Sequence, residues 1–156
     1  MRDFSGHTLY ETDFIAWAEE QAEALRIATP KISNLGLDLP NLIDEFDSLA
    51  RQEFTRLEDA VRGVLSRLIR AALDTDADRA RISLFEINGI LREACQRGSP
   101  TGLTRLEMDR LWAEAEAALP DYIILVGPGP CPFEASTLLS KDFSLRGALE
   151  TIRDLL

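Results

Sequence analysis

Apolar side chains recur at three- and four-residue intervals from Phe14 to Leu119. A period of about 3.6 residues places such side chains on one face of a helix, whereas a half-buried strand alternates at every second residue. The chain is therefore expected to form amphipathic helices that bury their apolar faces against one another. We predict an all-α protein, a single domain over residues 1–156, in which residues 1–8 are flexible.

Start and stop signals divide this pattern into four main helices. The longest follows a loop at Thr29–Leu39, has Pro40 in its first turn and ends near Leu73, a length of roughly 50 Å. Short turns favour antiparallel neighbours, so we predict a bundle with this helix at its centre and short helices at the C-terminus. The other expected helices are Thr12–Arg26, a helix from the acidic turn Asp74–Asp78 to the stop at Gly98–Pro100, Thr104–Leu119, Phe133–Leu139 and Ser144–Leu155.

The apolar arc of the longest helix includes Leu42 and Leu49 as well as Leu57 and Leu68, and we expect all four to face inward. A helix this long can protrude, and a protruding apolar stripe would invite dimerisation. The apolar run Tyr122–Val126 has the composition of a short strand but no second strand to pair with. The following Pro- and Gly-rich stretch, 127–132, is expected to be irregular.

The formal charge of −10 and the sequence pI of about 4.6 argue against a nucleic-acid surface, which must be basic. The longest apolar run is far too short to span a bilayer, and no signal peptide precedes the first helix. We therefore expect a cytoplasmic protein with no nucleic-acid or membrane partner. The central arginines (Arg51, Arg56, Arg62, Arg67, Arg70, Arg79 and Arg81) are interpreted as ion-pair partners of neighbouring acids.

Carboxylates on two expected helices raise the possibility of a magnesium site. Glu19, Glu20 and Glu23 form an EExxE spacing, and Asp44 and Asp47 lie one turn apart on the longest helix. Such acids on neighbouring helices are the oxygen ligands that Mg²⁺ prefers, and all-helical nucleotide pyrophosphatases resemble this arrangement. The three glutamates, however, face away from the apolar arc of their own helix. A solvated acidic face is the simpler interpretation, and magnesium belongs only to the alternative.

Glu53 stands out because it falls inside the apolar arc of the longest helix. A carboxylate in that position must be paired, hydrogen-bonded or neutral. An arginine or indole partner is the structural interpretation, and a ligand-binding or catalytic acid is the functional one. His7, the only histidine, and the two cysteines, Cys95 and Cys131, form no catalytic or metal-binding spacing, so we name no catalytic or cofactor-binding residue.

Three blocks of sequence resemble a known family. They are Leu9–Trp17 (LYETDFIAW), Leu39–Arg51 (LPNLIDEFDSLAR) and Cys131–Phe133 followed by Leu138 and Leu139. Together they resemble the bacterial "domain of unknown function 29" family, over about Leu9 to Phe143. The resemblance implies a helical fold and a bacterial source, and it brings no functional residue. The chain departs from the family pattern after Ala72, where a basic and aromatic stretch is missing, and past Phe143, where a further helix follows.

Three functions are compatible with these features. The first is a non-catalytic helical module that binds another protein or itself, which suits the absence of a catalytic set. The second is a Mg²⁺-dependent hydrolase of a phosphorylated small molecule that uses the helix-borne acids. The third is an antitoxin-like protein whose acidic surface masks a basic partner.

Overall fold

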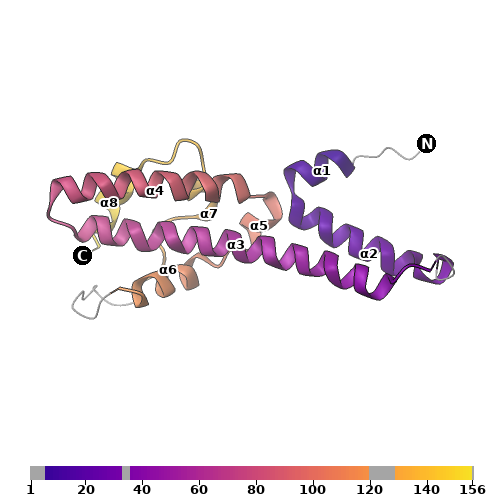
Figure 1. Cartoon of the computed structure of the whole chain (residues 1–156). Coiled ribbons are helices and arrows are strands. Elements are labelled where there is room, and N and C mark those ends of the chain that lie inside the picture. Colours follow the sequence, from indigo (N-terminus) through magenta and orange to yellow (C-terminus); the bar gives the residue numbers. More distant parts are fainter. Residues whose placement is uncertain (1–5, 33–35, 120–128, 156) are drawn as a thin grey trace. The chain divides into compact units, whose positions relative to one another are not determined.

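The computed structural model describes residues 6–32, 36–119 and 129–155. Every regular element within these ranges is a helix (Figure 1), which confirms the predicted all-α class. Among the same residues, no helix has both the length and the apolar character that a membrane crossing needs. The helices are α1 (Gly6–Thr12), α2 (Phe14–Ile32), α3 (Leu39–Leu73), α4 (Ala77–Arg97), α5 (Pro100–Arg105), α6 (Met108–Ala117), α7 (Ala135–Leu138) and α8 (Leu145–Arg153).

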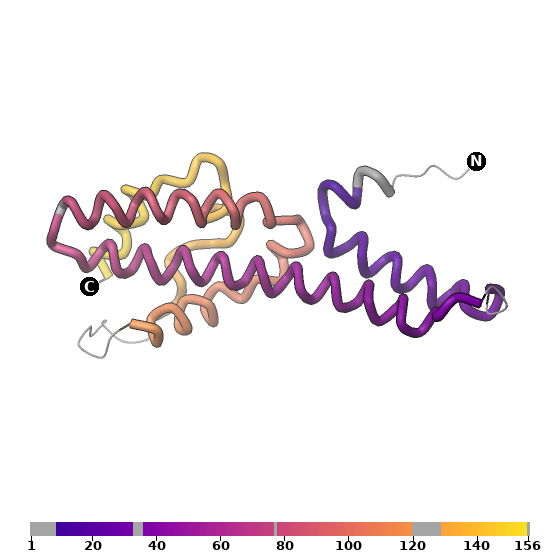
Figure 2. The backbone as a smooth tube through the Cα atoms, in the orientation of Figure 1, coloured from indigo at the N-terminus to yellow at the C-terminus, as the bar shows by residue number. Residues whose placement is uncertain are grey.

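Helix α3 is the predicted long central helix, and its 35 residues begin one position before Pro40. Figure 2 shows α2 running antiparallel beside the first half of α3, and α4 running antiparallel beside its second half. The turn between α3 and α4 is the predicted acidic one. The Asp76 carboxylate caps α4 by accepting hydrogen bonds from the backbone N–H groups of Asp78 and Arg79.

The chain divides into two compact units that share α3. Unit 1 contains residues 1–56 and 99–104, and unit 2 contains residues 57–98 and 105–156. The expectation that both form one domain stays a prediction. In unit 1, a small core of Ile15, Ala18 and Ala50 is packed against aromatic side chains. These are Phe14, Trp17, Phe46 and Phe54.

Unit 2 holds the larger core. Its fully buried side chains come from the second half of α3, from α4 and α6, and from the C-terminal helices. They include Leu57, Val61, Leu65, Leu68, Ile87, Leu111, Leu138 and Ile152. This matches the inner faces predicted for the expected helices around Ile87 and Leu111.

The sequence predicts a single helix, Thr12–Arg26, but the structure has a short helix α1 before it and a longer helix α2 that also takes up Thr29–Ile32 of the predicted loop. The predicted helix Thr12–Arg26 is interrupted at Asp13, where α1 ends and α2 begins, so Asp13 rather than Thr12 caps α2. Its carboxylate accepts a hydrogen bond from the N–H of Ala16 at 3.1 Å. Helix α2 then continues past Arg26, and Pro30 lies in its last turns without ending it.

The predicted helix Thr104–Leu119 is two helices, α5 and α6, separated at Leu106 and Glu107. The preceding helix α4 ends at Arg97 with Gly98 as its cap, as the stop signal at Gly98–Pro100 predicts, and Pro100 then occupies the first turn of α5, where its missing N–H costs nothing. The Ser99 hydroxyl supports this start by accepting a hydrogen bond from Gly102 N–H at 3.1 Å.

The apolar arc of α3 is only partly covered. Leu57 and Leu68 are buried as predicted, but Leu42 and Leu49 are 39% and 40% exposed, so their predicted burial is wrong. They lie at the edge of the arc, away from the direction in which Ala50 and Leu57 pack. The possible strand Tyr122–Val126 lies outside the described residues, as do residues 1–5, whereas residues 6–8 belong to α1.

Candidate functional site

The acids of the magnesium hypothesis do not meet at one point. Glu23 and Asp47 both bind the guanidinium of Arg26, which spans from α2 to α3 inside unit 1. Glu20 and Asp44 are exposed, and Glu19 is half-buried. Within the described residues, no group of three or more His, Cys, Asp or Glu side chains is placed to hold a metal ion. The arrangement gives the hydrolase hypothesis no support.

The exposed acids nevertheless leave an acidic face on unit 1. Glu20, Glu23, Asp44 and Glu45 all reach solvent. The antitoxin-like alternative requires such a face, and it stays a prediction because no contact in the structure selects a basic partner.

Glu53 is half-buried rather than enclosed. Its side chain is 20% exposed, and its Oε2 lies 3.5 Å from Nη1 of Arg56, one turn along α3. This is a local ion pair of the kind that amphipathic helices carry on their sides. Glu53 lines neither the pocket beside α4 at Asn88–Gln96 nor the one formed by Ser66, Arg67, Arg70, Ser83 and Glu86.

Both cysteines are protonated at neutral pH. Burial raises the pKa of the Cys95 thiol, which donates a hydrogen bond to the carbonyl oxygen of Leu139 at 3.3 Å. Burial also raises the pKa of Cys131, against a hydrogen bond from the Phe133 backbone that lowers it. Since the thiolate is the reactive form, neither thiol is prepared for nucleophilic chemistry.

The protonated form of the two thiols should react slowly with alkylating reagents. We expect both thiols to react with iodoacetamide at pH 7.5 more slowly in the folded protein than in urea, because the raised pKa values reduce the thiolate fraction. Mass spectrometry of labelled peptides measures each rate separately. Faster labelling of either cysteine in the folded protein would contradict this assignment.

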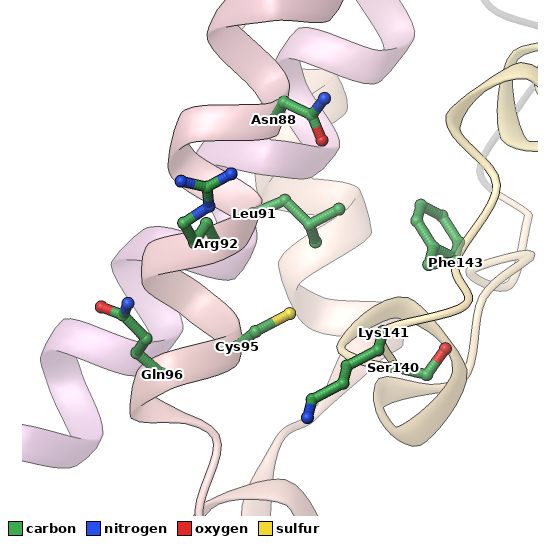
Figure 3. Close-up of a pocket in the computed structure, with 8 residues that line it drawn as sticks. All are labelled: Asn88, Leu91, Arg92, Cys95, Gln96, Ser140, Lys141 and Phe143. Carbon is green, nitrogen blue, oxygen red and sulfur yellow. The ribbon is translucent and has the colours of Figure 1, made fainter.

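Unit 2 contains a pocket of about 380 Å³ beside α4 (Figure 3). Leu91 and Cys95 point from α4 toward the segment that carries Phe143, and the Asn88 amide projects in the same direction. We call this space the α4 pocket. Its lining residues are Asn88, Leu91, Arg92, Cys95 and Gln96 from α4, with Ser140, Lys141 and Phe143 from the turn after α7.

The core of unit 2 holds the far wall of this pocket in place. Helix α7 is anchored by the fully buried Leu138, and the chain turns at Ser140, whose carbonyl accepts the N–H of Phe143 at 3.3 Å. The rings of Phe143 and Phe133 pack edge-to-face, with their centroids 5.8 Å apart. The rings of Phe133 and Trp112 pack in the same way, with their centroids 6.4 Å apart. Such edge-to-face contacts fix the ring positions.

The charged side chains of the α4 pocket are all cations. Arg92 and Lys141 line it, and no carboxylate does. Elsewhere in unit 2, arginines are held by acids: Arg62 and Arg110 both bind Glu114, at 3.1 and 2.7 Å. These bonds from Arg110 and Arg62 lower the pKa of Glu114. Within the described part of the chain, Arg92 and Lys141 have no such ion pair, so their charges are uncompensated locally.

The outer surface of α4 carries two exposed apolar side chains. Phe85 is 83% exposed and Ile82, one turn earlier, is 61% exposed. Gly89 follows one turn later, and a Cβ built there would meet nothing within 4 Å. We call Ile82 and Phe85 the α4 ridge. Arg81 lies beside the ridge and, within the described residues, has no ion-pair partner, unlike Arg56, Arg62 and Arg79.

The sequence predictions missed both surfaces. A detectable signal existed for the ridge, because Ile82 and Phe85 fall off the apolar arc of α4 defined by Leu84, Ile87 and Leu91. Large apolar residues on the polar side of an amphipathic helix need an explanation. No local signal predicts the pocket, since it joins residues about 50 positions apart.

Comparison with known proteins locates the chain in one family. The family described as "Domain of unknown function DUF29" matches residues 9–144. No curated protein matches the chain significantly. The crystal structure of an alpha-helical protein of unknown function from Rhodospirillum rubrum is similar, with a TM-score of 0.78 and 24% identity over 91% of this chain and 96% of that one. At that identity, the similarity establishes the fold alone.

Proposed function

The chain belongs to the DUF29 family, and we propose that it is a non-catalytic helical interaction module that binds an acidic segment of another protein along α4. The proposal depends most on Phe85, a large aromatic side chain that is 83% exposed on a regular helix. Exposed apolar side chains that lie together mark binding surfaces more often than single ones do. Aromatic residues are also enriched at the centres of protein interfaces.

The shape of α4 around Phe85 suits a partner that lies along the helix. Ile82 and Phe85 rise one turn apart, and Gly89 leaves a gap beside them. Residues at spacings of three and four stand above one another on a helix, so these three positions form one line. A bulky apolar side chain of a partner can enter the gap at Gly89 and pack against the Phe85 ring.

Charge selects the chemistry of the partner. Arg81 and Arg92 lie four residues before and seven residues after Phe85, which places both along one side of the ridge. Neither has a carboxylate partner among the described residues. A partner segment with acidic residues flanking an apolar one satisfies both arginines at once. With a screening length of roughly 8 Å in physiological salt, a partner at the ridge interacts more strongly with the charges beside it than with those on distant parts of the chain.

A second copy of the chain fits this surface less well. If two α4 helices paired antiparallel with Phe85 of each copy in the Gly89 gap of the other, Arg81 would face Arg92 across the interface. Like charges at that position oppose the pairing. We therefore favour a different protein as the partner.

A peptide library tests this proposal without knowledge of the natural partner. Peptides selected from a random displayed library on the folded protein should be acidic with an apolar centre. Phe85→Ser should weaken them by about 2 kcal/mol, roughly thirtyfold in Kd, because it removes the central apolar contact. Arg81→Glu should weaken them too, by reversing a complementary charge.

Leu37→Ser is the control, because Leu37 is also an exposed apolar residue, at 52%, but lies in unit 1. It should leave peptide affinity unchanged. The proposal would be contradicted if the selected peptides bound Phe85→Ser with unchanged affinity, or if they were basic. If sedimentation showed a dimer of the wild-type chain and a monomer of Phe85→Ser, the partner at the ridge would be a second copy of the chain and not another protein.

A further inference from the structure

We propose that the α4 pocket binds a small organic carboxylate with a compact apolar body, and that it shares Arg92 with the surface proposed for the partner protein. The pocket has the three components that such a ligand needs: cationic side chains, hydrogen-bonding amides and an apolar floor. Its volume of about 380 Å³ falls at the lower end of the range of ligand-binding cavities. Each component comes from described residues of unit 2.

The two cations set the charge of the ligand. Arg92 and Lys141 enter the lining from opposite walls, one from α4 and one from the turn after α7. The nearest acids in the sequence, Glu93 and Asp142, do not line the pocket. Glu93 is instead bound by Arg97 at 3.2 Å. An anion bound by Lys141, with Arg92 at the α4 rim of the pocket, therefore meets no opposing carboxylate in the lining.

The remaining lining sets the body of the ligand. Leu91 and Phe143 supply apolar surface from the two walls, and the thiol of Cys95 lies one turn along α4 from Leu91 (Figure 3). The Asn88 amide reaches the same space and can donate or accept a hydrogen bond. The Cys95 thiol is committed to the carbonyl of Leu139, so the pocket binds its ligand without covalent attachment.

A carboxylate fits better than a phosphate. Arginine and lysine both bind either group, but a phosphate carries up to two charges and three acceptor oxygens that need more donors. The α4 pocket offers two cations from walls that are otherwise largely uncharged, with a mainly apolar floor. A single carboxylate on an aromatic or branched aliphatic body uses all of these groups.

Ligand-observed NMR titration of the full-length protein tests the proposal with defined probes. Phenylacetate should bind with a measurable Kd, and phenylacetamide, its neutral isostere, should bind at least about tenfold more weakly. Lys141→Met and Arg92→Gln should each raise the phenylacetate Kd by about tenfold. Phenyl phosphate serves as the second anion and should bind no better than phenylacetate.

Two control variants separate this site from other effects. Arg146→Gln removes a cation of unit 2 that does not line the pocket, and Phe85→Ser removes the α4 ridge. Neither should change the Kd for phenylacetate. No binding by any probe, equal binding of the amide, stronger binding of phenyl phosphate, or equal losses in Arg146→Gln and Lys141→Met would overturn the proposal. Phe85→Ser changes no residue that lines the pocket. The phenylacetate titration can therefore be interpreted even if the peptide-library test fails.

Discussion

Replacing Ile87 by alanine is expected to lower the free energy of unfolding by about 2–5 kcal/mol, as measured by urea denaturation followed by circular dichroism. Ile87 is fully buried in the core of unit 2. The substitution removes apolar surface from that core and leaves a cavity that close-packed neighbours fill only in part. The expected loss is a large fraction of the stability of an ordinary domain.

The same substitution at Ile82 is the matched control. Ile82 is on the same helix, five residues earlier, but is 61% exposed. Its loss should change the free energy of unfolding by no more than about 0.5 kcal/mol, because surface substitutions remove little buried area. Equal losses for the two variants would mean that both faces of α4 are covered. The α4 ridge would then not be available to a partner, and the interaction proposal would fall with it.

Much of this fold follows from local sequence patterns. Helix α3 is predicted to within one residue at its start because Pro40 suits a first helical turn and the apolar period continues to Leu73. Helix α4 starts where the acidic turn predicts, because Asp76 offers its carboxylate to the first free N–H groups. Periodicity and capping depend on neighbouring residues, and a sequence displays both directly.

Other features depend on contacts that no local pattern contains. The apolar arc of α3 predicts burial for both Leu49 and Leu57, but only Leu57 has packed neighbours on its side of the helix. The α4 pocket likewise forms only when the turn at Ser140–Phe143 folds back on α4. The magnesium hypothesis depends on contacts of the same kind, since Arg26 forms ion pairs with Glu23 and Asp47 that the spacing of the acids does not reveal.

Asp13→Ala is expected to lower the free energy of unfolding by about 2–4 kcal/mol. Asp13 is only 5% exposed, and its carboxylate accepts hydrogen bonds from the backbone of two helices. One oxygen caps α2 through the N–H of Ala16, and the other accepts the N–H of Thr101 in α5 at 2.8 Å, 88 residues away in sequence. Alanine removes the cap and leaves the Thr101 N–H without its acceptor.

Asp13→Asn separates the hydrogen bonds from the charge, because the amide keeps an acceptor oxygen and nearly the same size. Burial alone would raise the pKa of Asp13, but hydrogen bonds from the Thr101 and Ala16 backbone and from Ser99 and Thr101 side chains favour the carboxylate and hold the pKa below its ordinary value. The asparagine variant should therefore lose less stability than the alanine variant at pH 7.

The lowered pKa also fixes how the difference between wild type and Asp13→Asn depends on pH. The unfolded state has the higher pKa, about 3.9, so it binds the proton first as the pH falls. The carboxylate contribution is complete above that value and is lost as the pH falls through the lower folded pKa. Urea denaturation from pH 7 to pH 3 should show a constant gap between the two proteins down to about pH 4, then a narrowing one. A gap that widens on acidification would mean that the folded protein raises the pKa of Asp13, and the double cap would then not be the stabilising contact that its geometry implies.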